Sequence, residues 1–153
     1  MRGHTGLRAA LLVLGAAIGG CGGAVEPGTP TTATVEVIVR DPDGAASQAT
    51  YKQLVLISGV CPNDSALVNG KFEAVESIQE IPQFGTAFDV SDLEFKKIAF
   101  VGVLRRDDCA VLAVGCTSAD LAVHKHITVE VDSVIPPAGA CASSQSCVDG
   151  QCK

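Results

Sequence analysis

Aromatic and basic residues are scarce in this sequence of 153 residues. It contains no tryptophan, one tyrosine and five phenylalanines, so a core has to be built from Val, Ile, Leu and Ala. A core rich in Val favours strands. Lysine and arginine together number 11 against 17 acidic residues, which gives a formal net charge of −6. We expect no nucleic-acid partner, because the chain lacks a basic patch that could release counterions from a phosphate backbone.

A hydrophobic run long enough to span a bilayer is also missing. As a helix, residues 9–20 (AALLVLGAAIGG) would extend about 18 Å at ~1.5 Å per residue, against a hydrocarbon core of ~30 Å. This run follows a basic start with Arg2 and Arg8 and ends in small residues. That order is typical of a secretory signal peptide. We therefore expect export, with a signal helix within residues 1–20.

Cys21 follows this run, and Ile18-Gly19-Gly20-Cys21 resembles the lipobox of bacterial lipoproteins. In that family the cysteine thiol receives a diacylglyceryl group, and the signal peptide is removed just before the cysteine. The resemblance implies lipidation of Cys21, with palmitate among the acyl chains, and stable membrane anchoring. Gly22 stands where Asp would imply inner-membrane retention, so the implied location is the outer membrane of the cell envelope, on its periplasmic or surface face. The alternative is an unlipidated secreted protein in which Cys21 forms a disulfide.

The rest of the chain divides by composition into three parts. Residues 21–34 are rich in Gly, Pro, Thr and Ala, which is typical of a flexible linker behind the lipidated cysteine. Residues 35–135 carry the strand patterns and form the predicted β domain. Residues 136–153 form a short Cys-rich tail.

Hydrophobic periodicity predicts strands throughout the β domain. Alternating apolar residues indicate half-buried strands, and continuous apolar runs indicate strands buried on both faces. The predicted strands cover 35–40, 53–58, 76–81, 88–95, 97–106, 109–115 and 127–134. Asn69-Gly70 lies between apolar segments at 66–75 and predicts a hairpin. Pro136-Pro137 is expected to end the last strand.

These strands, with closely spaced turn signals and no amphipathic helix, predict an all-β fold. We expect an antiparallel Greek-key β-sandwich of about seven strands. Residues 88–104, FDVSDLEFKKIAFVGVL, resemble the strand–Leu–turn–strand element of carboxypeptidase-regulatory and transthyretin-like sandwiches. That resemblance implies the same fold class. A generic hairpin of any sandwich is the alternative.

Six cysteines remain once Cys21 is assigned to lipid, and in an oxidising compartment we expect all six to form disulfides. They are Cys61, Cys109, Cys116, Cys141, Cys147 and Cys152. Three belong to the β domain and three to the tail, so an odd number of bridges has to join the two parts. Within one strand, Cys109 and Cys116 would lie too far apart to bond, so we expect Cys61 to pair with one of them. The other pairings stay open, because six cysteines allow fifteen complete sets.

The end of the tail, CVDGQC, resembles the short Cys-rich ends of secreted lipoproteins of myxobacterial type. In this stretch Asp149-Gly150 predicts a turn. A zinc site is the alternative use of the tail cysteines, although the CxxC spacing typical of structural zinc is absent from it.

No catalytic constellation stands out in the sequence, and we predict no catalytic residue, no metal ligand and no cofactor. We expect a non-enzymatic β-sandwich, structural or binding another envelope protein or a surface ligand. The alternative is a metal-binding protein or small metal-dependent enzyme, in which His124 and His126, with Asp120 nearby, hold Zn²⁺ or Cu²⁺. Asp41 and Asp43 in DPDG are expected to form a turn and not a calcium site.

Overall fold

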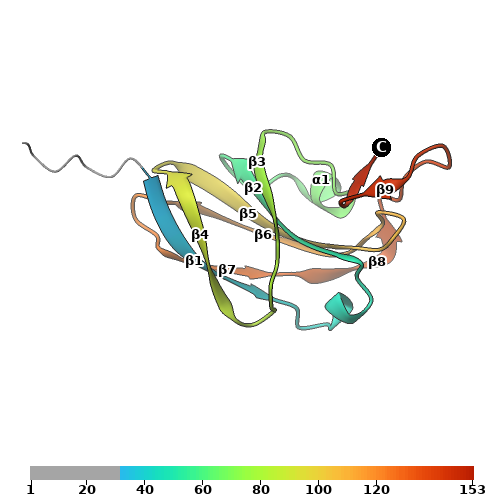
Figure 1. The fold of residues 1–153 in the computed structure, drawn as a ribbon, viewed down its shortest axis with the longest axis horizontal. Helices are drawn as coiled ribbons and strands as arrows, with labels where there is room; N and C mark the ends of the chain where they lie inside the picture. Colours follow the sequence, from blue (N-terminus) through green and yellow to red (C-terminus); the bar gives the residue numbers. More distant parts are fainter. Residues whose placement is uncertain (1–31) are drawn as a thin grey trace, which may run out of the picture.

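The computed structural model describes residues 32–153 (Figure 1). The predicted signal helix within 1–20, Cys21 and most of the predicted linker lie outside the described residues. Within them the chain is mostly β, as predicted, with ten strands and one short α-helix. The elements are β1 (Thr32–Arg40), β2 (Tyr51–Ser58), α1 (Asp64–Val68), β3 (Val75–Glu80), β4 (Ala87–Glu94), β5 (Lys97–Arg105), β6 (Val111–Asp120), β7 (His126–Glu130), β8 (Asp132–Ala138), β9 (Cys147–Val148) and β10 (Gln151–Cys152). No helix of the described part of the chain is long and apolar enough to cross a membrane.

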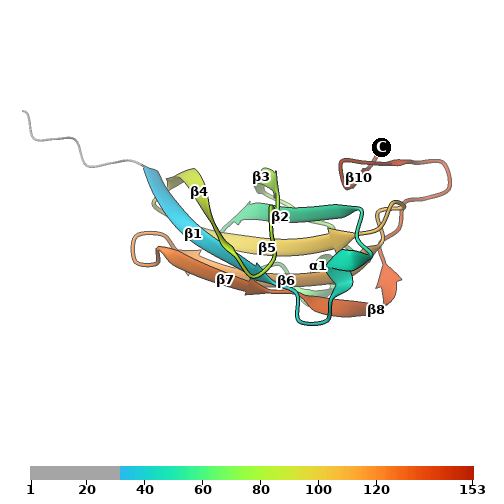
Figure 2. The same cartoon turned by 60° about the horizontal axis from the view of Figure 1, so that its bottom comes forward.

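Eight of these strands form two sheets that lie one above the other (Figure 2). The smaller sheet has the order β4-β1-β7 and the larger one the order β3-β2-β5-β6-β8. Every pair of neighbours is antiparallel except β1 and β7, which run parallel. The prediction of a purely antiparallel arrangement is therefore wrong at this pair. A parallel pair needs a long crossover, and here the chain forms β2, β3, β5 and β6 of the larger sheet, and also β4, between β1 and β7.

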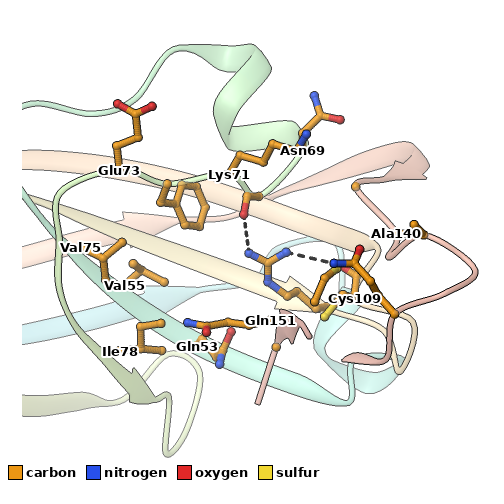
Figure 3. A pocket seen from close by; sticks show the side chains of 18 residues that line it. Gln53, Val55, Asn69, Lys71, Glu73, Val75, Ile78, Cys109, Ala140 and Gln151 are labelled. Atoms are coloured by element: carbon orange, nitrogen blue, oxygen red, sulfur yellow. Dashed lines mark hydrogen bonds between the residues drawn. The ribbon is translucent and has the colours of Figure 1, made fainter. Parts of the chain in front are cut away.

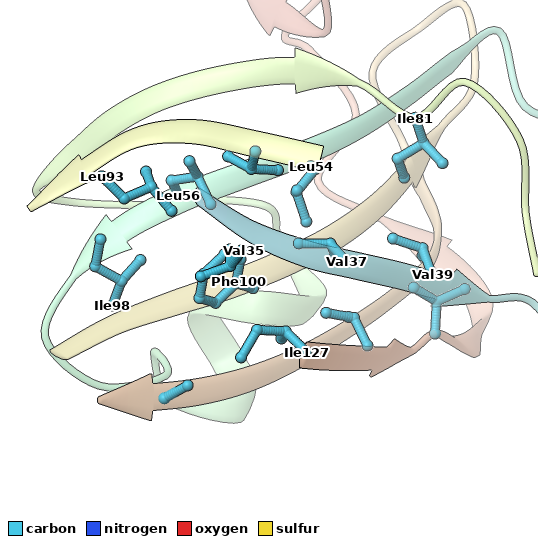
Figure 4. Packing of buried hydrophobic residues seen from close by; sticks show 14 of the residues in the cluster. Val35, Val37, Val39, Leu54, Leu56, Ile81, Leu93, Ile98, Phe100 and Ile127 are labelled. Carbon is cyan, nitrogen blue, oxygen red and sulfur yellow. The ribbon is translucent and has the colours of Figure 1, made fainter. Parts of the chain in front are cut away.

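The main core lies between the two sheets (Figure 4). In β1, the predicted alternation is confirmed, because Val35, Val37 and Val39 are buried while the residues between them are more exposed. They face Leu54 of β2 and Phe100 of β5, both fully buried (Figure 4). Phe100 is the largest fully buried side chain of the described residues, which suits a chain with few aromatic residues.

The larger sheet is covered on its outer face as well. Alternate residues of the central strand β5 point to opposite faces, so that Ile98 faces the main core while Val101 and Val103 face outward. The outward side chains form a second buried cluster, against which Leu67 and Phe72 pack from the segment after β2. This explains why residues 98–104, within the predicted strand 97–106, form one continuous apolar run.

That covering segment contains α1, where a hairpin was predicted. The predicted hairpin is wrong, because this segment forms a short helix. Asn63 caps the helix by accepting a hydrogen bond from the Ala66 amide at 2.9 Å. Asn69 is the C-cap, and Gly70 follows with φ +61°, the left-handed conformation that commonly ends a helix. Asn-Gly is thus used here as a helix stop and not as a hairpin turn.

The predicted strand 127–134 is in fact two strands that belong to different sheets. β7 ends at Glu130 in the smaller sheet, and β8 then pairs with β6 at the edge of the larger sheet. Gly115 of β6 permits this close approach, because a Cβ there would lie 1.8 Å from the Glu130 carbonyl oxygen. Contrary to expectation, β8 continues through Pro136-Pro137. Proline is tolerated in an edge strand, where its missing N–H breaks no ladder bond.

The main core predicts a large effect of truncating its one buried ring. We expect Phe100→Ala to lower the free energy of unfolding by about 3–5 kcal/mol, since it removes buried surface and leaves a cavity. Phe95→Ala is the matched control, because Phe95 is 40% exposed, and we expect it to cost about 1 kcal/mol or less. Urea denaturation of the disulfide-bonded protein measures both. Equal losses for the two variants would contradict this description of the core.

Candidate functional site

A cavity of about 810 Å³ opens on the outer face of the larger sheet. Strands β2, β3 and β5 form its floor, with Val55, Ile78 and Arg105 among the lining residues (Figure 3). One wall is the segment 69–73 that follows α1, and the other is the Cys-rich tail, 139–152. Three parts of the chain that are far apart in sequence therefore enclose one space.

Disulfides hold the tail wall in place. Cys109, in the β5–β6 turn, is bonded to Cys147, and Cys141 is bonded to Cys152. The prediction that an odd number of bridges joins tail and domain is confirmed, since only the first of these two crosses between them. In an entropic description, a bridge of this kind stabilises the fold by about 2–4 kcal/mol.

The third disulfide, Cys61–Cys116, ties the segment that contains α1 to strand β6, with a Cα–Cα distance of 5.9 Å. It confirms the expectation that Cys61 pairs with one of the two cysteines 109 and 116. Because this segment supplies the opposite wall, covalent bonds fix both walls of the cavity. Together the three disulfides use all six cysteines of residues 32–153.

Hydrogen bonds from β2 position the end of the tail. The Gln53 side-chain amide donates to the Asp149 carbonyl at 2.8 Å, and the Tyr51 hydroxyl donates to the Cys147 carbonyl at 3.2 Å. Between β9 and β10, Asp149 and Gly150 both have positive φ, as in the tight hairpin turn that Asp-Gly favours. The predicted turn at Asp149-Gly150 is therefore confirmed, and the tail is an ordered wall.

Arg105 is the charged group on the cavity floor. It ends β5 on the same face as Val101 and Val103, and only 6% of its surface is exposed. Its guanidinium donates to the Gly70 carbonyl at 2.9 Å and to the Cys109 carbonyl at 3.3 Å (Figure 3). The guanidinium carbon lies 5.8 Å from the centre of the Phe72 ring, a cation–π distance. Arg105 thus links both walls to the sheet.

This arginine has no acidic partner. None of the salt bridges within residues 32–153 includes it, and its Nε–H has no hydrogen-bond partner. Burial lowers the pKa of the Arg105 guanidinium, but arginine still stays charged at neutral pH. The cavity floor therefore carries a buried positive charge that no carboxylate of residues 32–153 neutralises.

The neighbouring Arg106 shows the contrast. It is exposed and forms an ion pair with Asp108 in the same turn. Hydrogen bonding to Arg106 lowers the pKa of Asp108 below its usual value. The nearby acid is thus engaged with Arg106 and does not serve Arg105. At the cavity rim, Lys71 and Glu73 are both exposed and carry opposite charges, and Glu73 lies at the end away from Cys109 (Figure 3).

The histidines proposed as an alternative metal site are placed on the β6–β7 turn and at the start of β7. The His126 ring nitrogen lies 3.1 Å from a Glu36 carboxylate oxygen, and His124 contributes its backbone N–H to the Asp120 carbonyl. Asp120 in turn accepts a hydrogen bond from the Ala122 amide. These three side chains are not among the groups of potential metal ligands that lie together in the described residues.

The only such group in residues 32–153 consists of the sulfur atoms of Cys109, Cys141 and Cys147, which lie within 4.8 Å of one another. All three sulfurs belong to disulfides, so none is a thiolate that could hold zinc.

In the DPDG segment, Asp41 accepts hydrogen bonds from the Ala45 and Ala46 amides. That is the turn predicted there.

Reasoning from sequence missed Arg105 as a site residue. In the sequence, Arg105 and Arg106 form only a pair, which is too small for a basic patch. The useful signal is the alternation of the strand, because Val101, Val103 and Arg105 share one face and two of them are buried valines. An arginine that continues an apolar face at a strand end is a candidate for a buried charge.

The contact between Arg105 and the first wall can be tested at Gly70. A Cβ there would lie 2.3 Å from an Arg105 nitrogen, and φ is +61°. We expect Gly70→Ala to lower the free energy of unfolding by about 2–4 kcal/mol, from backbone strain and displacement of the guanidinium. Gly85→Ala is the matched control, because Gly85 has φ +74° and a Cβ added there would meet no atom within 4 Å. Strain alone predicts a loss of about 1–2 kcal/mol there. Denaturation that shows no difference between the variants would contradict the described contact.

The sequence matches no protein-family model, and comparison with curated proteins and with solved structures gave no match. What this protein binds is therefore inferred from the chemistry of the cavity around Arg105. The residues that carry the inference lie on β2, β3 and β5 and on the two disulfide-tied walls.

Proposed function

We propose that this protein is a lipid-anchored component of a bacterial cell envelope, and that its β domain binds a ligand without transforming it. Cys21 is the lipidated residue in this proposal, and the cavity around Arg105 is the binding site. In this proposal the segment 21–34 tethers the domain to the membrane, and the membrane is the outer membrane of the envelope.

The observation that carries the anchoring proposal is the use of the cysteines. The three disulfides consume all six cysteines of the described domain. None of those cysteines is left to pair with Cys21, which disfavours the alternative of a disulfide at that position. Disulfides also persist in oxidising compartments outside the cytoplasm, where a lipoprotein of the envelope would reside.

The binding proposal is supported by the cavity itself. Its volume, about 810 Å³, lies in the range of sites that hold small organic molecules, which are concave, largely apolar and carry a few polar groups. Its walls are fixed by two disulfides, Cys61–Cys116 to strand β6 and Cys109–Cys147 to the β5–β6 turn. A site whose walls are ordered in advance loses less conformational entropy on binding.

We also infer that the two sheets form a Greek-key sandwich. In the smaller sheet, β1 lies between β4 and β7 and is next to neither of them in the chain. The shared core between the sheets supports the sandwich. In this arrangement the cavity lies on the outside of one layer, away from the main core.

Lipidation of Cys21 is tested by labelling the protein with radioactive palmitate in a bacterial host. We expect label in the wild type and its complete loss in Cys21→Ala, since no other thiol would be the acceptor. Cys152→Ala is the matched control, because it removes a tail cysteine and leaves the N-terminal motif intact; it should label like the wild type. Equal labelling of wild type and Cys21→Ala would overturn the anchoring proposal.

A further inference from the structure

We infer that Arg105 is the receptor for the carboxylate of an amphipathic organic anion, whose apolar part lies against Val55, Val75 and Ile78. This inference rests on the proposed binding role of the cavity and names the class of ligand. It is carried by the pairing, in one cavity, of a buried unneutralised charge with an exposed apolar wall.

Arg105 lacks a full set of hydrogen-bond acceptors. A guanidinium has five N–H donors, and the protein accepts hydrogen bonds from two of its nitrogens through the carbonyls of Gly70 and Cys109. The Nε–H is buried without a partner. Removing a charge from water is costly unless an opposite charge or further hydrogen bonds compensate. A bound anion would supply both.

A monoanionic carboxylate fits this receptor best. Arginine binds planar carboxylates through two parallel hydrogen bonds, so that one guanidinium neutralises one carboxylate. The other cation lining the cavity, Lys71, is offset by Glu73 at the same wall. The cavity therefore offers one net positive charge, which suits a single negative charge better than a doubly charged phosphate.

The apolar wall depends on an irregularity in the sheet. The register between β2 and β3 shifts at Leu56/Ile57, so that Val75 is opposite Ile57 while Ile78 is opposite Val55. The shift brings Val75 and Ile78 to the same outer face, where they are 41% and 38% exposed. Both line the cavity with Arg105 (Figure 3). A hydrocarbon chain attached to the carboxylate would cover this exposed surface.

The experiment compares three probes that separate charge from apolar surface. Octanoate carries both, octanol carries only the chain, and acetate carries only the charge. The protein is the full chain with Cys21→Ser, so that no acyl group of its own competes, labelled with ¹⁵N and oxidised. We expect octanoate to shift the Arg105 Nε–H resonance and the backbone amides of Val55 and Ile78. Its dissociation constant should be about tenfold or more below those of octanol and acetate, in keeping with a charge-assisted hydrogen bond.

Two variants test the charged group of the cavity, Arg105, and its apolar wall, which contains Ile78, separately. Arg105→Met should reduce the affinity for octanoate to that for octanol. Because Arg105 also supports the walls, its variant could lose its fold, so Ile78→Ser provides an independent measurement at an exposed position. Ile78→Ser should weaken octanoate and octanol by the same factor, about threefold or more, and leave acetate unchanged, since only apolar contact is removed.

The outcomes separate this inference from the proposed function. Equal affinity of the wild type for octanoate and octanol would overturn the carboxylate inference and leave a binding cavity standing. Octanoate shifts that occur away from Val55, Ile78 and Arg105 would overturn it as well. Absence of binding by all three probes would overturn both the inference and the binding role, while the anchoring proposal is judged by palmitate labelling alone.

Discussion

A positive charge held out of water organises the outer face of the larger sheet. Arg105 reaches from the end of β5 to the carbonyl of Gly70 on one wall and to that of Cys109 at the base of the other. Both contacts require close approach: Gly70 has no side chain that would displace the guanidinium, and Cys109 is fully buried. The two carbonyls solvate the charge only in part, because dipoles do not neutralise it. The same interaction therefore explains how the walls are placed and why we propose that an anion binds there.

Disulfides also hold the two walls of the cavity in place. This acidic chain has few aromatic side chains whose packing could hold two surface segments against a sheet. Cys61–Cys116 holds the segment with α1, and Cys109–Cys147 holds the tail, so each wall of the cavity has its own disulfide. The bonds to Asp149 and Cys147 from β2 then orient the tail hairpin. Both walls of the cavity are thus held by disulfides, which persist in oxidising compartments.

Local periodicity predicts most of this fold from sequence, because each strand buries one or both faces. The alternating valines of β1 and the continuous apolar run of β5 are both found as expected. Wrong predictions arise where one local sequence pattern is compatible with two different structures. Asn69-Gly70 suits a hairpin or a helix end, and the cap at Asn63 decides for the helix. The direction of β7 beside β1 depends on contacts far along the chain, which periodicity does not encode.

The site was less predictable than the fold. The cysteine count showed that tail and domain are joined, and one pairing could be narrowed to two choices, but the cavity depends on where three distant segments meet. The role that we propose for Arg105 depends on the absence of an acidic partner among residues 32–153, which is a property of the fold. A count of charges along the sequence treats Arg105 and Arg106 alike. Among the described residues, however, Arg106 has a carboxylate partner and Arg105 has none.

The central claim is that Arg105 neutralises a bound carboxylate, and the pKa of that carboxylate tests it most directly. Octanoate labelled with ¹³C at its carboxyl carbon can be titrated in the bound state by NMR. A neighbouring guanidinium favours the charged form of the carboxyl, so binding through Arg105 predicts a bound pKa below that of free octanoate. A carboxyl buried against Val55 and Ile78 without Arg105 would instead have a raised pKa. A bound pKa that is equal to or above the free value would contradict the account.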